Sequence, residues 1–175
     1  MNKQERFLKL YEPIHDRFER FCRARLYGHS SFMEHSDLMN DSLLIAYDKF
    51  ESLESEKAFL SFLFGIAIRI LSNHQKKKKE ERFISDNQMV MVASSSASDL
   101  NAELHFLYKA LNHLNLEQRE SIILFEISGF SIKEIAVLHQ TSESSVKQRL
   151  KRGREKLANI LAYNSINKEK EVQNG

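Results

Sequence analysis

Hydrophobic positions recur at spacings of three and four along most of the chain, and this pattern is typical of amphipathic helices. The first helix should carry its apolar face on Phe7, Leu8, Leu10, Tyr11, Ile14, Phe18, Phe21 and Cys22. Pro13 interrupts this stretch. Proline lacks a backbone donor and clashes with the preceding turn, so we expect a kink or the first turn of a new helix there.

Two further helices are predicted in the N-terminal part. The first covers DLMNDSLLIAYDKF, with Ser36 or Asp37 as its N-cap. ESLESEK follows and reads as a loop. The next helix begins near Lys57 and ends in NHQKKKK, so we expect a buried apolar start and a solvated basic end.

The C-terminal part predicts four short helices. LHFLYKALNHL and LEQRESIILFEISG come first, with Gly129 as a candidate C-cap. Ser131 and Ser142 are candidate N-caps of the last two. The last helix should bury Val146, Leu150 and Leu157. Gly153 costs about 1 kcal/mol relative to Ala in a helix, which close packing would offset.

Composition supports an all-α fold, because one proline and five glycines in 175 residues leave few turns. The SSSAS segment has no helical periodicity, so we expect a flexible linker over residues 83–101. The predicted architecture is two small helical domains, 1–82 and 102–163, the second a helix-turn-helix. Residues 164–175 read as a disordered tail. No secretory signal or membrane-spanning stretch is present in the sequence, so we expect a cytoplasmic protein without membrane insertion.

A net charge of +2 is too small to indicate a nucleic-acid partner, but the positive charges are concentrated in two stretches. The first comprises Arg69, Lys76, Lys77, Lys78, Lys79 and Arg82, and the second Lys147, Arg149, Lys151, Arg152, Arg154 and Lys156. The second stretch follows a helix and a short turn, as in a helix-turn-helix whose second helix enters the major groove. Its residues alone leave two interpretations open: a DNA-reading helix or a solvated basic face.

The sequence resembles a known family in two separate places. LNLEQRESIILFEISGFSIKEIAVLHQTSESSVKQRLKRGREKL resembles the promoter-distal domain of bacterial RNA polymerase sigma factors, particularly the extracytoplasmic-function group. DLMNDSLLIAYDKF and AFLSFLFGIAIRILSNHQKKKK resemble the other conserved domain of that group, in the same order. The family usually has Gly and Ile where this chain has Gln140 and Thr141.

The resemblance implies core RNA polymerase and promoter DNA as partners. The implied polymerase-binding residues are Asp37, Leu38, Asn40, Asp41 and Leu44. For the minus-ten element the family uses a loop, here Glu51 to Lys57, and a helix face, here Arg69, Asn73 and His74, with Lys76 and Lys77 on phosphates. For the minus-thirty-five element it implies Lys147, Gln148 and Arg152 near bases, and Ser145, Arg149 and Arg154 on phosphates.

Enzyme activity finds no support, because no nucleophile, P-loop or zinc-protease motif occurs and the histidines lack metal-finger spacing. We therefore expect no cofactor and no metal. A conventional helix-turn-helix regulator that binds operators as a dimer is the alternative function. A module that only sequesters an anti-sigma protein is a third. The resemblance also implies an anti-sigma factor as a partner.

Overall fold

The computed structural model describes residues 1–28, 33–84 and 102–173, with the side chains of these residues except 78–84 and 164–173. All regular structure in that part of the chain is helical, which confirms the all-α prediction. The chain divides into two compact units, Met1–Ala93 and Ser94–Gly175. Most of the linker expected at 83–101 lies outside the described residues.

The N-terminal unit begins with two helices joined by a single 3-10 turn. They are α1 (Lys3–Tyr11), the 3-10 helix η1 (Glu12–Ile14) and α2 (His15–Leu26). Pro13 lies in the first turn of η1, where its missing N–H is not needed. The interruption predicted at this proline is therefore confirmed. Asn2 caps α1, and its side-chain oxygen accepts from the Glu5 N–H at 2.9 Å.

The next long helix, α3 (His35–Asp48), starts earlier than the sequence suggested. Its N-cap is Glu34, and the Glu34 N–H donates to Asp37 Oδ2 at 3.2 Å. The prediction of Ser36 or Asp37 as the N-cap was wrong, because Asp37 serves as a capping partner from inside the first turn. After α3, the expected loop contains two 3-10 turns, η2 (Phe50–Ser52) and η3 (Glu56–Ala58).

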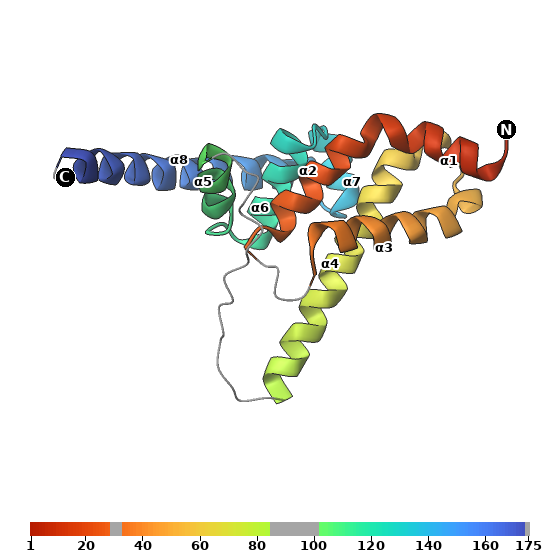
Figure 1. Ribbon diagram of the computed structural model, residues 1–175, viewed down its shortest axis with the longest axis horizontal. Helices are drawn as coiled ribbons and strands as arrows, with labels where there is room; N and C mark the ends of the chain where they lie inside the picture. The colour runs from red at the N-terminus through yellow and green to blue at the C-terminus, as the bar shows by residue number, and fades with distance from the viewer. Residues whose placement is uncertain (29–32, 85–101, 174–175) are drawn as a thin grey trace. The chain divides into compact units, whose positions relative to one another are not determined.

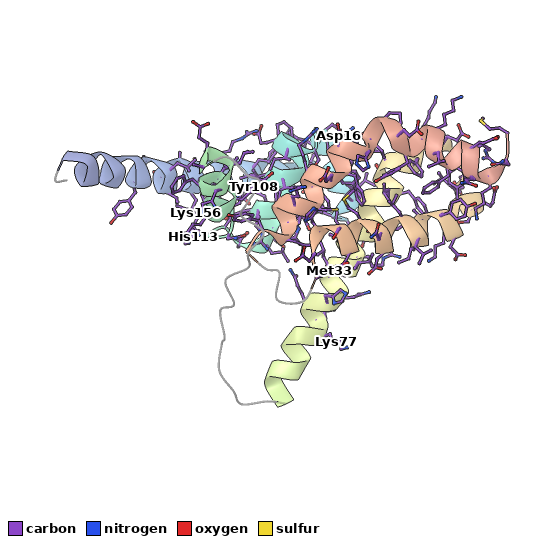
Figure 2. All side chains as sticks on the ribbon, viewed as in Figure 1. Asp16, Met33, Lys77, Tyr108, His113 and Lys156 are labelled. Atoms are coloured by element: carbon purple, nitrogen blue, oxygen red, sulfur yellow. The ribbon has the colours of Figure 1, made fainter. Side chains whose placement is uncertain are left out.

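Helix α4 (Phe59–Ile84) carries its buried side chains in its first half, from Phe59 to Leu71. It packs on α3, which also packs on α2, around Phe18, Phe21 and Phe64. The Phe64 ring lies 5.1 Å from Phe18 and 5.0 Å from Phe21 between centroids. The later turns of α4 extend away from the other helices of the unit (Figure 1). Lys77 stands on this extension (Figure 2), so the predicted solvation of the basic end is confirmed as far as Lys77.

The C-terminal unit packs three short helical stretches against one long helix. The elements are α5 (Ala102–Leu111), α6 (Leu116–Ile122), the π-helical turn η5 (Ile123–Ile127), α7 (Ile132–Leu138) and α8 (Glu143–Gln173). α5, α6 and α7 all contact α8. The C-cap of η5 is Ser128, so the prediction of Gly129 as the C-cap was wrong by one residue. Gly129 follows it with φ of 67°, a left-handed conformation that glycine adopts without strain.

Gly153 is buried where α8 meets α6. A Cβ atom added there would lie 2.6 Å from Ile122 Cδ1, so the close packing expected at this glycine is confirmed. Val146, Leu150 and Leu157 are buried as predicted. α8 continues to Gln173, whereas the sequence suggested a disordered tail from residue 164. Residues 164–173 contain no glycine or proline to end the helix.

Candidate nucleic-acid interface

Helix α7, a short turn and α8 form the helix-turn-helix, and its first helix is capped from both directions. The Glu134 N–H donates to Ser131 Oγ at 3.2 Å, and the Ser131 N–H donates to Glu134 Oε2 at 2.8 Å. This capping box confirms Ser131 as the N-cap. Ile135 and Ala136 are buried on the inner face of α7, so this helix packs against the core of the C-terminal unit.

The turn uses a left-handed residue that is not glycine. Gln140 has φ of 50°, the only positive φ of a non-glycine residue in the described ranges. The Thr141 N–H donates to the Ala136 carbonyl at 2.9 Å, and the Gln140 N–H to that of Val137 at 3.2 Å. These two bonds make a Schellman ending of α7. The chain therefore keeps a tight turn where the resembling family usually has glycine.

Serines organise the first turn of the second helix. The Ser145 N–H donates to Ser142 Oγ at 3.2 Å, which confirms Ser142 as the N-cap of α8. The Ser142 hydroxyl also lies 2.9 Å from the hydroxyls of Ser144 and Ser145. Hydroxyls and backbone N–H groups gathered at a helix N-terminus can bind a phosphate. Ser145 is half-buried, and a phosphate there would compete with its bond to Ser142.

One side of α8 presents unpaired polar side chains to solvent. Lys147, Gln148, Lys151 and Arg152 are exposed. None of these four forms an ion pair or hydrogen bond with another residue whose side chain the structure describes. The arrangement provides lysine and arginine donors suited to guanine edges and a glutamine suited to adenine. The structure thus brings three predicted base-contacting residues to one surface.

Two other predicted DNA contacts already have protein partners. Arg149 Nη2 lies 3.2 Å from Glu117 Oε1, and Arg149 Nη1 lies 3.4 Å from His139 Nδ1. Arg154 donates from Nε and Nη2 to Glu126 Oε1 at 2.9 and 2.6 Å. Its guanidinium also lies 5.2 Å from the Phe125 ring centroid. These two arginines are bound to α6 and η5, and hydrophobic periodicity could not have predicted this pairing.

A buried pair supports the turn from below. His139 Nε2 lies 3.1 Å from Glu120 Oε2, and both side chains are close to fully buried. His139 is the C-cap of α7, whereas Glu120 belongs to α6. The pair therefore ties the helix-turn-helix to the preceding helix. Sequence reasoning missed it, because its partners are distant along the chain and neither lies on the basic face.

The residues predicted to bind polymerase divide into an exposed group and one buried residue. Asp37, Asn40, Asp41 and Leu44 are exposed along one face of α3, and Leu44 is 71% exposed. Leu44 is therefore accessible to a partner, and it lines a hollow together with Ile45 and Ile70. Leu38 is fully buried, so it supports α3 from the core and presents no surface to a partner.

The exposed face of α3 adjoins the predicted minus-ten face of α4. An open hollow of about 370 Å³ is lined by Asp41, Leu44, Ile45, Ile70, Asn73 and His74. Asn73 is exposed and His74 is half-buried in this hollow. Arg69, Lys76 and Lys77 are exposed on the same helix. The two predicted sites of this unit are therefore contiguous.

Among the described residues, His15, Asp16 and Glu19 could bring three ligand atoms within 4.8 Å of one another. The Tyr11 hydroxyl and His15 Nδ1 are 2.8 Å apart, and Glu19 Oε1 accepts from Arg23 at 2.7 Å. Two of the three residues, His15 and Glu19, thus already have protein partners. No helix in the described ranges is long and apolar enough to cross a membrane.

Comparison with known proteins points in one direction. The family model of sigma-70 region 4 matches residues 107–157, which include the helix-turn-helix. SigX of Bacillus subtilis, an extracytoplasmic-function RNA polymerase sigma factor, is 30% identical over 159 residues, 86% of this chain and 80% of SigX. CarQ of Myxococcus xanthus, also an RNA polymerase sigma factor, is 27% identical over 90% of each chain.

Solved structures show the same likeness. The sigma factor RpoE of Bartonella quintana, solved with the anti-sigma factor NepR, superposes with a TM-score of 0.77 at 28% identity. The match covers 89% of this chain and 96% of RpoE. CnrH, solved with the cytosolic domain of CnrY, has a TM-score of 0.69 at 21% identity and shares the fold.

Proposed function

The chain belongs to the extracytoplasmic-function sigma factors of the sigma-70 family, and we propose how its residues divide the work of promoter recognition. Its function is promoter-specific initiation of transcription by RNA polymerase, and it catalyses no reaction itself. The N-terminal unit then binds the polymerase and the minus-ten element, and the C-terminal unit binds the minus-thirty-five element.

Core polymerase contacts the exposed face of α3 in this proposal. The residues are Asp37, Asn40, Asp41 and Leu44, while Leu38 acts only by holding the helix in place. The exposure of Leu44 supports this assignment, since it offers an apolar anchor surrounded by acidic and amide groups. Interfaces commonly depend on a few such anchors.

The minus-ten element is read by α4 and the segment before it. Arg69, Asn73 and His74 meet the bases of the separated non-template strand, and the segment from Glu51 to Lys57 captures a base that leaves the stack. Extruding a base costs a few kcal/mol of unstacking, which a fitted pocket can return. Lys76 and Lys77 meet phosphates, which adds affinity but no sequence information.

The minus-thirty-five element is read in the major groove by α8, where Lys147, Gln148 and Arg152 reach base edges. Ser145 meets a phosphate at the N-terminus of the helix. Arg149 and Arg154 remain candidates for phosphate contacts, although their ion pairs favour a role in holding α8. The observation that carries this assignment is the exposed, unpaired set on α8 beyond a capped turn.

We also propose an anti-sigma factor as a regulatory partner. The support is RpoE of Bartonella quintana, which is 28% identical to this chain and was solved with the anti-sigma factor NepR. We place the protein in the cytoplasm, where bacterial transcription takes place.

Run-off transcription tests the function. Core RNA polymerase from the bacterium that encodes the chain is mixed with fragmented genomic DNA, with and without the purified protein. We expect discrete new transcripts whose upstream sequences share two elements. Tight binding of the protein alone to a palindrome, without new transcripts, would instead identify a conventional dimeric regulator.

A further inference from the structure

The segment from η2 to η3, which joins α3 to α4, is closed at both ends by one residue of α1. Phe50 is the first residue of η2, at one end of the segment. Phe59 is the first residue of α4, at the other end. The ring of Phe7 lies edge-on to both, 5.4 Å from Phe50 and 5.3 Å from Phe59 between centroids. Phe50 and Phe59 are themselves 6.0 Å apart. Phe7 thus brings the two ends of the segment together in a buried aromatic cluster.

The neighbouring residue, Arg6, joins the same two ends by charge. Arg6 Nη1 lies 3.5 Å from Glu51 Oε2, and Arg6 Nε lies 3.6 Å from Glu56 Oε1. The guanidinium also lies 5.3 Å from the Phe50 ring centroid. One cation from α1 is therefore placed between two carboxylates of η2 and η3.

A third contact fastens the end of α3. Lys3 Nζ lies 4.4 Å from the Tyr47 ring centroid and 3.5 Å from the Asp48 carbonyl oxygen. Tyr47 in turn lies edge-on to Phe7, 5.3 Å away between centroids. Lys3, Arg6 and Phe7 share one face of α1, so this face follows the chain from the last turn of α3 to the start of α4.

The segment from η2 to η3 is acidic, so a nearby cation such as Arg6 reduces the repulsion within it. Glu51, Glu54 and Glu56 lie within six residues, and like charges repel both one another and a nucleic-acid backbone. Arg6 lies close to two of the three acids, whereas Glu54 has no ion pair within the described part of the chain. A cation at Arg6 lowers the net negative charge that approaching DNA would meet.

We propose that α1 supports the loop from Glu51 to Lys57, called here the minus-ten loop. Phe7 holds the ends of the loop together, and Arg6 is a positioning residue that fixes its acidic ends. The inference rests on the proposed base-capturing role of Glu51 to Lys57. Arg6 itself touches no base. It sets the shape and charge of the loop, and through them the choice of minus-ten sequence.

The test uses full-length protein in holoenzyme on a promoter mapped by the run-off experiment. Arg6→Gln removes the cation but leaves Phe7 in place. Lys9→Gln is the matched control, because Lys9 lies on the same helix, is exposed and has no partner in the described residues. The readouts are transcription from the mapped promoter, the ratio of that rate to the rate on single-base minus-ten variants, and binding to core polymerase.

We expect Arg6→Gln to lower transcription by roughly 2- to 10-fold, as two partly exposed ion pairs permit, and to change the ratio among minus-ten variants. Core binding and the Lys9→Gln variant should match the parent protein. Arg6→Glu should be worse than Arg6→Gln, and adding Glu51→Arg with Glu56→Arg should restore activity. Equal behaviour of Arg6→Gln and Lys9→Gln would overturn the inference.

A loop variant separates this failure from failure of the proposed function. Leu53→Ala with Glu54→Ala changes the middle of the loop and leaves both Arg6 contacts in place. If that variant alters the minus-ten ratio and Arg6→Gln does not, the support by α1 is refuted while base capture stands. If neither alters the ratio, both assignments are refuted.

Discussion

At the scale of single residues, Gln140 adopts an unfavourable backbone conformation in the turn between α7 and α8. Its φ of 50° lies in the left-handed region, which costs a residue with a Cβ about 1–2 kcal/mol. The cost is tolerated because the turn completes two hydrogen bonds that end α7. Gln140 is therefore a strained link between the two helices that place the DNA-reading face.

Gln140→Gly should stabilise the C-terminal unit by up to about 1 kcal/mol, because relief of the left-handed strain exceeds the added flexibility of the unfolded chain. Amide hydrogen exchange in α7 and α8 measures the change. Lys133→Gly is the control at an exposed position in the first turn of α7, and it should destabilise by up to about 1 kcal/mol. Destabilisation by Gln140→Gly would contradict the assigned turn geometry.

Gly153 makes the opposite case, since adding a methyl group there should destabilise. Helix propensity alone favours Ala by about 1 kcal/mol, but the new Cβ would lie 2.6 Å from Ile122 Cδ1, and overpacking costs about 1–3 kcal/mol. Chemical denaturation compares Gly153→Ala with the parent protein. Ile122→Val removes Cδ1, so it should cost less stability in the Gly153→Ala background than alone. If the two substitutions changed the free energy of unfolding additively, α6 and α8 would not be in contact at Ile122 and Gly153.

At the scale of elements, α8 has two polar faces: one is proposed to read DNA, and the other is paired with acidic residues of the same unit. Lys147, Gln148 and Arg152 face solvent, whereas Arg149 and Arg154 face acids of α6 and η5. The π-helical turn presents Phe125 and Glu126 together to Arg154. The orientation of the reading helix is therefore set partly by charge.

The two faces predict different salt dependences. Log affinity falls with log salt, and each phosphate contact increases the steepness of that slope by about 0.9. Arg152→Gln should make the salt dependence of binding less steep only if Arg152 contacts a phosphate in addition to a base. The same expectation applies to Lys147→Gln. Arg154→Gln should weaken minus-thirty-five binding without changing the slope, and Glu126→Gln should do the same. A slope lowered by Arg154→Gln alone would make Arg154 a phosphate contact after all.

Local rules placed most elements, and partners distant in sequence escaped them. Pro13, Ser131 and Ser142 act through their own neighbours, so their roles followed from residue type and spacing. The pairing of Arg154 with Glu126 depends on how two helices meet, which periodicity does not determine. Leu38 and Leu44 show the same limit: both fit one amphipathic pattern, yet only packing decides that Leu38 is buried.

At the scale of the whole molecule, polymerase binding and minus-thirty-five recognition are assigned to different compact units. Each unit has its own buried core and its own exposed candidate surface. Substitutions on exposed side chains usually change stability by less than about 0.5 kcal/mol. Surface variants of either unit should therefore affect one interaction and leave the other intact.

Leu44→Asp should weaken binding to core polymerase by about 10-fold or more, the loss expected of a central anchor, because it places a charge where an apolar contact is proposed. Fluorescence anisotropy of labelled protein titrated with core polymerase measures the loss. Leu38→Asp is the contrasting variant: it buries a charge in the core, so it should unfold the N-terminal unit. Circular dichroism distinguishes the two outcomes.

Lys147→Ala with Arg152→Ala should impair promoter recognition and not polymerase binding. Neither side chain has a partner within the described residues, so the two substitutions should leave the fold unchanged. The double variant should bind core polymerase as the parent protein does, but its holoenzyme should lose preference for the mapped minus-thirty-five element. Each lost base contact accounts for about 1–3 kcal/mol of discrimination, so the preference should fall by roughly 10-fold or more. Retained preference would refute the assignment of α8 as the reading helix. Loss of polymerase binding by the same variant would refute the division of labour between the units, because a surface in one unit would then serve both interactions.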